Sequence, residues 1–114
     1  MRPTLAGLYV NIKNNEVIFA STDSFRLTEY KTNLEQAVST DFSQIIPSKT
    51  CNQLKSILQD EDIVKIVSGD NQVAFLTGNI KIYSRLLNGK FPDYLNFFPT
   101  TYSTKAEVNR VDLI

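Results

Sequence analysis

The sequence predicts an α+β protein in which an antiparallel sheet carries a helix packed on one face. Three observations predict this class: apolar and polar residues alternate near the N-terminus, one apolar stripe has helical spacing after Pro47, and three short β-rich runs follow. The 114 residues suit a single domain. With 42% hydrophobic and 21% charged residues, the composition is that of a globular protein.

The first half predicts a hairpin followed by a third strand. Apolar side chains alternate with polar ones from Leu8 to Lys13, and Asn14-Asn15 supplies turn chemistry before "EVIFA" (16–20). "FRLTEYK" (25–31) alternates again and predicts the third strand, whereas the polar run "NLEQAVSTD" (33–41) predicts a loop.

The middle of the chain predicts a short strand and a helix. "DFSQIIP" (41–47) ends in a proline, which favours a helix entrance with Ser48 as the N-cap and an end near Gln59. One face of this helix is apolar and the opposite face mildly basic. The residues of the apolar stripe are Cys51, Leu54, Ile57 and Leu58.

The second half predicts three more strands. They are "DIVKIVS" (62–68), "NQVAFLT" (71–77) and "NIKIYSRLL" (79–87), with turns at 68–70 and 78–79 that tolerate positive φ. This helix and three-stranded meander has a counterpart in the first half, where the same meander lacks its helix. The chain therefore contains an internal duplication with one helix missing.

Charge and composition exclude several classes of protein. Twelve basic and twelve acidic side chains cancel, so the chain lacks the basic excess of an autonomous nucleic-acid binder. The chain has no histidine and one cysteine, Cys51, so we expect neither a structural zinc site nor an internal disulfide. No apolar run has the length of a signal peptide or a membrane span, and a cytoplasmic protein is the simplest interpretation.

The stretch "ASTDSFRLTEY" (20–30) invites a catalytic interpretation with Asp23 as base and Ser24 as nucleophile. Adjacent residues of a strand point to opposite faces, and no histidine is available as a proton relay. The sequence also has no glycine-rich phosphate loop. We therefore predict a protein without catalytic activity, metal or cofactor. The alternative is a stand-alone small α+β domain that binds or hydrolyses a ligand at this loop.

Three collinear motifs carry a family resemblance. "STDSFRL" (21–27), "IIPSK" (45–49) and "SRLLNGKFPDY" (84–94) resemble the middle domain of the bacterial DNA polymerase III β subunit, the sliding clamp. The matching family segments read close to A-T-D-G-H-R-L, I-I-P-x-K and S-R-L-I-E-G-x-F-P-D-Y. The resemblance covers nearly the whole chain in the right order.

The resemblance implies a DNA-clamp fold and a processivity factor of DNA replication. It implies a head-to-tail homodimeric ring of three-domain subunits that encircles duplex DNA, with helices lining the hole. The implied partners are the DNA polymerase III α subunit, the clamp loader and repair polymerases. Residues 1–104 would then be a partial middle domain that lacks its first strand and helix, and residues 105–114 the start of the third domain. A domain lacking one helix exposes apolar sheet, so we expect it to dimerise, exchange elements or be poorly stable.

The resemblance also implies a pocket that takes peptides of the type Gln-Leu-x-Leu-Phe. The matching positions are Leu5, Thr22, Ser24, Phe25, Arg26, Leu27, Pro92, Asn96 and Phe97. Ser24, Phe25 and Asn96 differ from the family's common residues, which puts the preferred peptide in question. The alternative is that Leu27 and Phe97 are core residues, and that Arg26 pairs with Asp23 or Asp93 to fix a bend.

For DNA, the resemblance points to Arg2 at the inner surface and to Lys49 and Lys55 on the helix. Lysines on a helix are also common as solvated charges, so both interpretations stay open. We interpret the acidic run 60–62 as a solvated turn.

Overall fold

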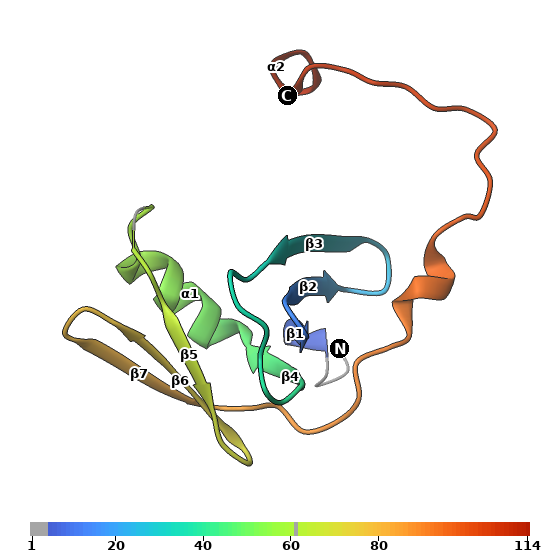
Figure 1. Cartoon of the computed structure of the whole chain (residues 1–114). Coiled ribbons are helices and arrows are strands. Elements are labelled where there is room, and N and C mark those ends of the chain that lie inside the picture. The colour runs from blue at the N-terminus through green and yellow to red at the C-terminus, as the bar shows by residue number, and fades with distance from the viewer. Residues whose placement is uncertain (1–4, 61) are drawn as a thin grey trace.

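The computed structural model describes residues 5–60 and 62–114 (Figure 1). Within these described residues, seven strands, two α-helices and the 3₁₀ turn η2 follow one another. They are β1 (Gly7–Lys13), β2 (Glu16–Thr22), β3 (Leu27–Asn33), β4 (Phe42–Pro47), α1 (Ser48–Ile57), β5 (Lys65–Ser68), β6 (Gln72–Thr77), β7 (Ile80–Arg85), η2 (Tyr94–Phe97) and α2 (Arg110–Leu113). The predicted α+β class is confirmed.

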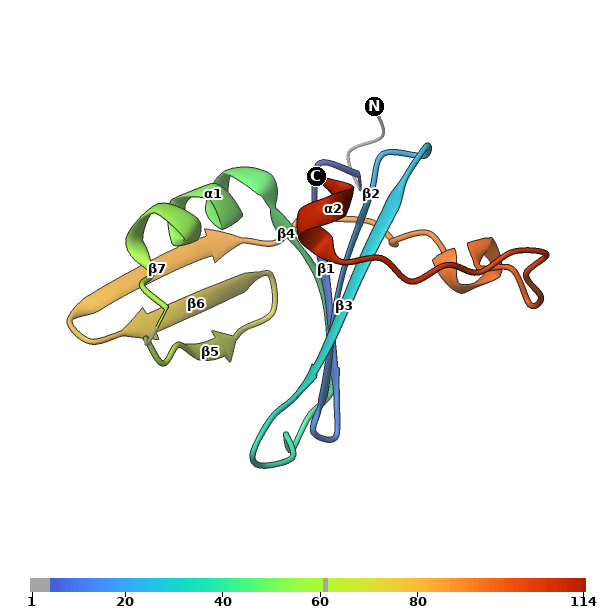
Figure 2. The same cartoon turned by 90° about the horizontal axis from the view of Figure 1, so that it is seen from above.

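The strands form two antiparallel sheets. The first has the order β3-β2-β1-β4 and the second the order β5-β6-β7. Each sheet contains a three-stranded meander, so the predicted duplication is present in the structure. Figure 2 shows the two sheets on opposite sides of the β4 and α1 connection. They meet at one bridge, in which the Leu87 N–H donates to the Ile45 carbonyl at 2.9 Å.

The predicted β1–β2 hairpin is confirmed. Val10 and Ile12 are buried, whereas Lys13 is exposed, which follows the alternation in the sequence. Asn14 adopts φ 55° in the turn, a conformation that asparagine tolerates better than most residues. In the β6–β7 turn Gly78 adopts φ 54°. Gly69 has no positive φ, so the β5–β6 turn does not use the glycine freedom that the sequence suggested.

Helix α1 begins at Ser48, one residue earlier than an N-cap at Ser48 implies, and is capped differently. Its N-cap is Pro47, with no side-chain cap, and the Ser48 hydroxyl donates instead to the Ala6 carbonyl at 2.7 Å. The expectation of a Ser48 N-cap is therefore wrong, because Ser48 is itself the first residue of the helix. The helix ends at Ile57, with Leu58 as C-cap, two residues before the predicted end at Gln59.

Several strand boundaries also differ from the prediction, three of them with a visible structural cause or consequence. The third strand begins at Leu27 instead of Phe25, because residues 23–26 form a hydrogen-bonded bend. The fifth begins at Lys65, and Ile63 before it is exposed. The seventh ends at Arg85, after which Leu87 turns to the bridge with β4.

The main core lies between the two sheets and α1. Val10 and Ile46 from the first sheet meet Val73, Phe75 and Ile82 from the second. Cys51, Leu54 and Ile57 pack against this cluster, which confirms three of the four residues of the predicted apolar stripe. The fourth, Leu58, is the C-cap and lies outside the helix. A hydrogen bond of 2.7 Å between the Thr50 and Ser84 hydroxyls joins α1 to β7.

The C-terminal segment runs away from both sheets. Residues 99–114 are exposed throughout, and α2 stands apart from the sheets in Figure 1. Among the described residues, no helix has the length and apolar character to span a membrane.

Candidate peptide pocket and DNA-facing helix

The bend between β2 and β3 is built by the side chains of Thr22 and Asp23. The Thr22 hydroxyl donates to the Arg26 carbonyl at 2.7 Å and accepts the Ser24 N–H at 3.2 Å. One carboxylate oxygen of Asp23 accepts the N–H groups of Phe25 at 3.0 Å and Arg26 at 3.1 Å. The other oxygen lies 2.9 Å from the Arg26 guanidinium. Asp23 is thus the partner of Arg26, one of the two carboxylates considered from the sequence.

Asp23 and Ser24 lie in this bend, not at adjacent positions of a strand. The strand argument against a catalytic pair was therefore wrong in its geometry. The Asp23 carboxylate is occupied by two backbone N–H groups and Arg26, and the Ser24 backbone has φ 80°. A serine in this left-handed region is strained, and the family's common glycine would not be.

Two backbone N–H donors, from Phe25 and then Arg26, hold the pKa of Asp23 below its ordinary value of 3.8, and the Arg26 charge adds to them. A lowered folded-state pKa means that the ionised carboxylate stabilises the bend above pH 3.8, and that this contribution is lost as the pH falls through the lowered pKa. We expect an NMR titration of the Asp23 carboxyl to show a midpoint below 3.8. The backbone hydrogen bonds lower the pKa more than the Arg26 charge does, so the midpoint should stay below that value in Arg26→Ala. A midpoint at or above it would contradict the hydrogen bonds described here.

The second half of the site is an aromatic cluster on the outer face of the first sheet. Phe91 stacks on Tyr9 at 4.8 Å between centroids with an interplanar angle of 8°, and Tyr94 meets Phe91 edge-on at 6.0 Å. Tyr94 is 6% exposed, and burial together with the neighbouring Glu29 raises its pKa. This cluster fixes the "FPDY" segment on the sheet, and η2 follows directly from it.

A hollow of about 260 Å³ opens between the bend and η2. Its walls come from two segments far apart in sequence. The lining residues are Thr22, Ser24, Phe25, Arg26, Leu27 and Phe97. All six belong to the nine residues predicted for the pocket. Phe25 is 93% and Phe97 61% exposed, so neither is a core residue.

The other three predicted residues lie elsewhere. Leu5 is buried, Asn96 is exposed on η2, and Pro92 lines a different hollow beside Tyr9 and Phe91. Their part in the pocket stays a prediction. Leu27 packs against the cluster of Ala20, Ile45, Phe91 and Tyr94 as well as lining the hollow.

Tyr9 holds the second wall in place through Phe91, a role that the sequence motifs did not indicate. The alternation in β1 assigned Tyr9 to the polar face of the sheet. That face is covered by residues 91–94, and the clue was the concentration of aromatic residues in "FPDYLNFF".

Helix α1 presents neutral polar side chains and two lysines to solvent. Lys49 and Lys55 are both exposed, and residues 48–57 include no acidic side chain. Arg2, the third predicted DNA-facing residue, lies outside the described residues. Burial raises the pKa of Cys51 on the opposite face, which keeps its thiol protonated at neutral pH.

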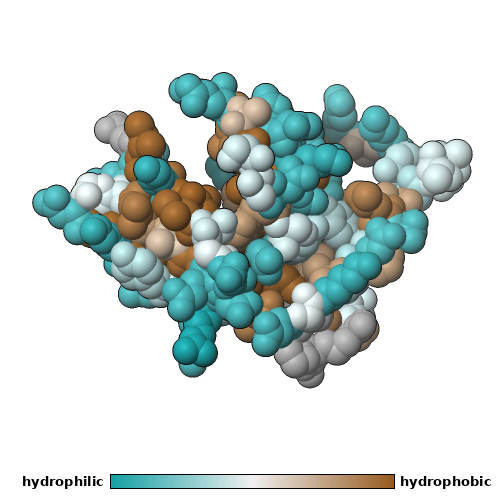
Figure 3. Space-filling model, turned by 60° about the horizontal axis from the view of Figure 1, so that its bottom comes forward, coloured by the Kyte–Doolittle hydropathy of each residue, from teal (hydrophilic) through white to brown (hydrophobic). Residues whose placement is uncertain are grey.

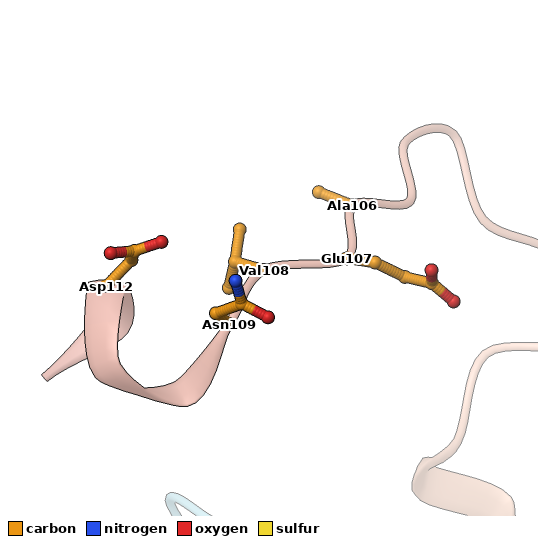
Figure 4. A pocket seen from close by; sticks show the side chains of 5 residues that line it. All are labelled: Ala106, Glu107, Val108, Asn109 and Asp112. Carbon is orange, nitrogen blue, oxygen red and sulfur yellow. The ribbon is translucent and has the colours of Figure 1, made fainter.

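Two other features carry no chemistry. The C-terminal segment forms an open hollow of about 830 Å³ lined by Ala106, Glu107, Val108, Asn109 and Asp112. In Figure 4 the Glu107 side chain points away from Asn109 and Asp112, so the polar groups do not converge. In the part of the chain that the structure describes, no group of histidine, cysteine and acidic residues is arranged to hold a metal ion.

A family model described as DNA polymerase III beta subunit, central domain, matches residues 1–93. The chain belongs to this family. It is 41% identical over 112 residues to the beta sliding clamp of Staphylococcus epidermidis, covering 97% of this chain and 29% of that protein. It is 40% identical over 109 residues to the beta sliding clamp of Staphylococcus aureus, covering 95% and 29%.

Solved structures of the family have the same fold. The DNA polymerase sliding clamp from Bacillus subtilis superposes with a TM-score of 0.83 at 33% identity, covering 89% of this chain and 27% of that one. The DNA polymerase III beta chain from Streptococcus pneumoniae has a TM-score of 0.80 at 35% identity, covering 89% and 27%. The chain therefore spans about 29% of the length of the relatives it matches in sequence.

Proposed function

We propose that this chain is part of a DNA replication processivity factor, a ring-shaped sliding clamp that encircles duplex DNA. In this role the ring tethers DNA polymerase III and other partners through the hollow between the β2–β3 bend and η2. The observation that carries the proposal is the convergence of six pocket residues from two distant segments on one hollow, in a chain of the sliding-clamp family.

The chemistry of the hollow supports a peptide ligand. Phe25 and Phe97 expose aromatic surface, Leu27 provides an aliphatic floor, and Thr22, Ser24 and Arg26 supply polar groups at the rim. Exposed apolar side chains rimmed by polar ones are typical of sites that anchor a few apolar residues of a partner. The bend is prearranged by its internal hydrogen bonds, so binding requires little ordering of this wall.

The role of α1 in the proposal is to face the DNA. Lys49 and Lys55 approach phosphates without reading bases, and contacts of this kind are non-specific and salt-dependent. A sliding ring needs weak contacts of this kind, because topology holds it on the DNA. The net charge of zero is compatible with such a role.

We extend the proposal to the assembly. The clamp acts without catalysis as a head-to-tail homodimeric ring in the bacterial cytoplasm, and its partners are the DNA polymerase III α subunit, the clamp loader and repair polymerases. Residues 1–104 form part of the middle domain, and residues 105–114 begin the third. The rival function, hydrolysis at the 22–27 bend, is less well supported. The Asp23 carboxylate already binds the backbone N–H groups of Phe25 and Arg26 and the Arg26 guanidinium.

Peptide binding tests the pocket directly. A fluorescent Gln-Leu-Ser-Leu-Phe peptide is titrated against the Staphylococcus epidermidis clamp in which this chain replaces the matched segment. We expect saturable binding that weakens at least about tenfold in the double variant Phe25→Ala, Phe97→Ala, because exposed aromatic anchors dominate such interfaces.

The control is Tyr30→Ala, Tyr102→Ala, which removes two aromatic side chains of 63% and 65% exposure outside the hollow. It should bind the peptide within about twofold of the parent chimera. A folded chimera that fails to bind the peptide, or an equal loss in both double variants, would contradict the pocket.

A further inference from the structure

The outer face of the β5-β6-β7 sheet has an ordered pattern of its own. The strand register aligns Val67 with Ala74 and Ala74 with Tyr83, so these three form one row across the sheet. The adjacent row on the same face consists of Lys65, Leu76 and Lys81. On the other side of the apolar row, Arg85 pairs with Gln72. An apolar row therefore lies between two positions of positive charge.

No acidic residue occupies a strand position of this face. Lys65, Lys81 and Arg85 are exposed, and neither Lys81 nor Arg85 forms a salt bridge with a carboxylate in residues 5–60 and 62–114. Asp70 lies in the β5–β6 turn. At strand spacing, Lys65 and Lys81 are about 10 Å apart at their Cα atoms, and Lys81 and Arg85 about 13 Å.

The apolar row contains a hollow. A depression of about 200 Å³ is lined by Val67, Ala74 and Tyr83, with Ser68 and Gly69 of the β5 end beside them. Val67 is 44% and Tyr83 69% exposed. Figure 3 shows apolar surface among hydrophilic residues on the side where this sheet lies in Figure 1. The volume suits one branched aliphatic side chain.

The corresponding face of the other sheet is covered. There Phe91 and Tyr94 pack on Tyr9, Ala20 and Leu27. The C-terminal residues run along the side away from β5 to β7, as Figure 1 shows. The two meanders are thus alike in topology, but one outer face is covered by the chain itself and the other exposes Val67 and Tyr83 on either side of the buried Ala74.

We propose that the outer face of the β5-β6-β7 sheet is a docking site for an acidic peptide with one branched apolar residue. The apolar side chain enters the hollow between Val67, Ala74 and Tyr83, and flanking carboxylates meet Lys81 on one side and Arg85 on the other. Charge complementarity selects the ligand class. Single-stranded nucleic acid fits less well, because its bases need successive aromatic platforms and this face has only Tyr83. The site is separate from the hollow at the β2–β3 bend.

The test is a titration of the Staphylococcus epidermidis clamp chimera that carries this chain with a labelled Asp-Glu-Asp-Leu-Asp-Glu-Asp peptide at low salt. Saturable binding is expected, and it should weaken at least about tenfold in Lys81→Glu, Arg85→Glu. The matched control is Lys13→Glu, Lys105→Glu, which makes the same change in net charge at exposed residues off this face and should alter binding by less than about threefold. Circular dichroism verifies that each variant is folded.

Two further arms test the hollow and the ligand class. Replacing the peptide's Leu by Ser should weaken binding several-fold, because the apolar anchor is lost. A (dT) oligonucleotide should bind more weakly than the peptide. The proposal is overturned if the two double variants lose equal peptide affinity, or if replacing Leu by Ser leaves the affinity unchanged. It is also overturned if the oligonucleotide binds more tightly than the peptide, or if no saturable peptide binding occurs up to about 1 mM.

Discussion

Replacing Gly7 by Ala is expected to destabilise the chain by about 2–3 kcal/mol, at the upper end of the usual cost of overpacking. A Cβ at this position would collide with the backbone carbonyl of Ile46, and would lie 2.8 Å from Ile45 Cγ2 and 3.0 Å from Leu87 Cδ1. A backbone atom cannot rotate away, so β1 and β4 would have to separate. The measurement is the midpoint of urea unfolding followed by circular dichroism.

The matched control for this prediction is Gly69→Ala. A Cβ at Gly69 would approach nothing closer than the Gln72 carbonyl at 3.9 Å, so the midpoint should stay within the range of a neutral surface change. Equal midpoints for the two alanine variants would show that β1 and β4 do not pack as closely as described.

Replacing Ile45 by Ala should cost about 2–5 kcal/mol, the range for truncating a buried aliphatic side chain. Ile45 is 2% exposed, and its backbone carbonyl accepts the Leu87 N–H that joins the two sheets. A cavity here would loosen the bridge as well as the cluster under the "FPDY" segment. Such a loss is a large fraction of the 5–15 kcal/mol that stabilises an ordinary domain.

The comparison for Ile45 is Ile63→Ala, which removes the same atoms from a residue that is 88% exposed. Its effect on the free energy of unfolding should lie within about 0.5 kcal/mol of zero. If the two substitutions shift the midpoint equally, Ile45 is not part of a packed core.

Local patterns predicted the repeating parts of the fold because these parts depend on neighbours along the chain. The alternation in β1, the Asn14 turn and the stripe of Cys51, Leu54 and Ile57 all have a fixed period, which secondary structure alone imposes. Ser48 is the first residue of α1 and not its N-cap, and its hydroxyl donates to the Ala6 carbonyl, which is distant in sequence. Tertiary hydrogen bonds of that kind leave no local signal.

The pocket could be predicted in part. The motifs identified both walls, and Thr22, Phe25, Leu27 and Phe97 do line one hollow. The directions of Pro92 and Asn96 could not be predicted, because they depend on how residues 91–94 stack against Tyr9. The pattern of charges on the outer face of the β5-β6-β7 sheet could not be predicted from the sequence. It depends on the strand register, which brings Lys65 and Lys81 into one row from distant segments.

The most direct test of the central claim, that the chain serves as part of a sliding clamp, is the length of DNA made in one binding event. The chimera with the Staphylococcus epidermidis clamp is loaded on primed circular DNA with that bacterium's clamp loader and DNA polymerase III. Our account predicts long products, as with the parent clamp, and short products for Phe25→Ala, Phe97→Ala. A folded, loaded chimera that gives only the short products seen without a clamp would contradict the account.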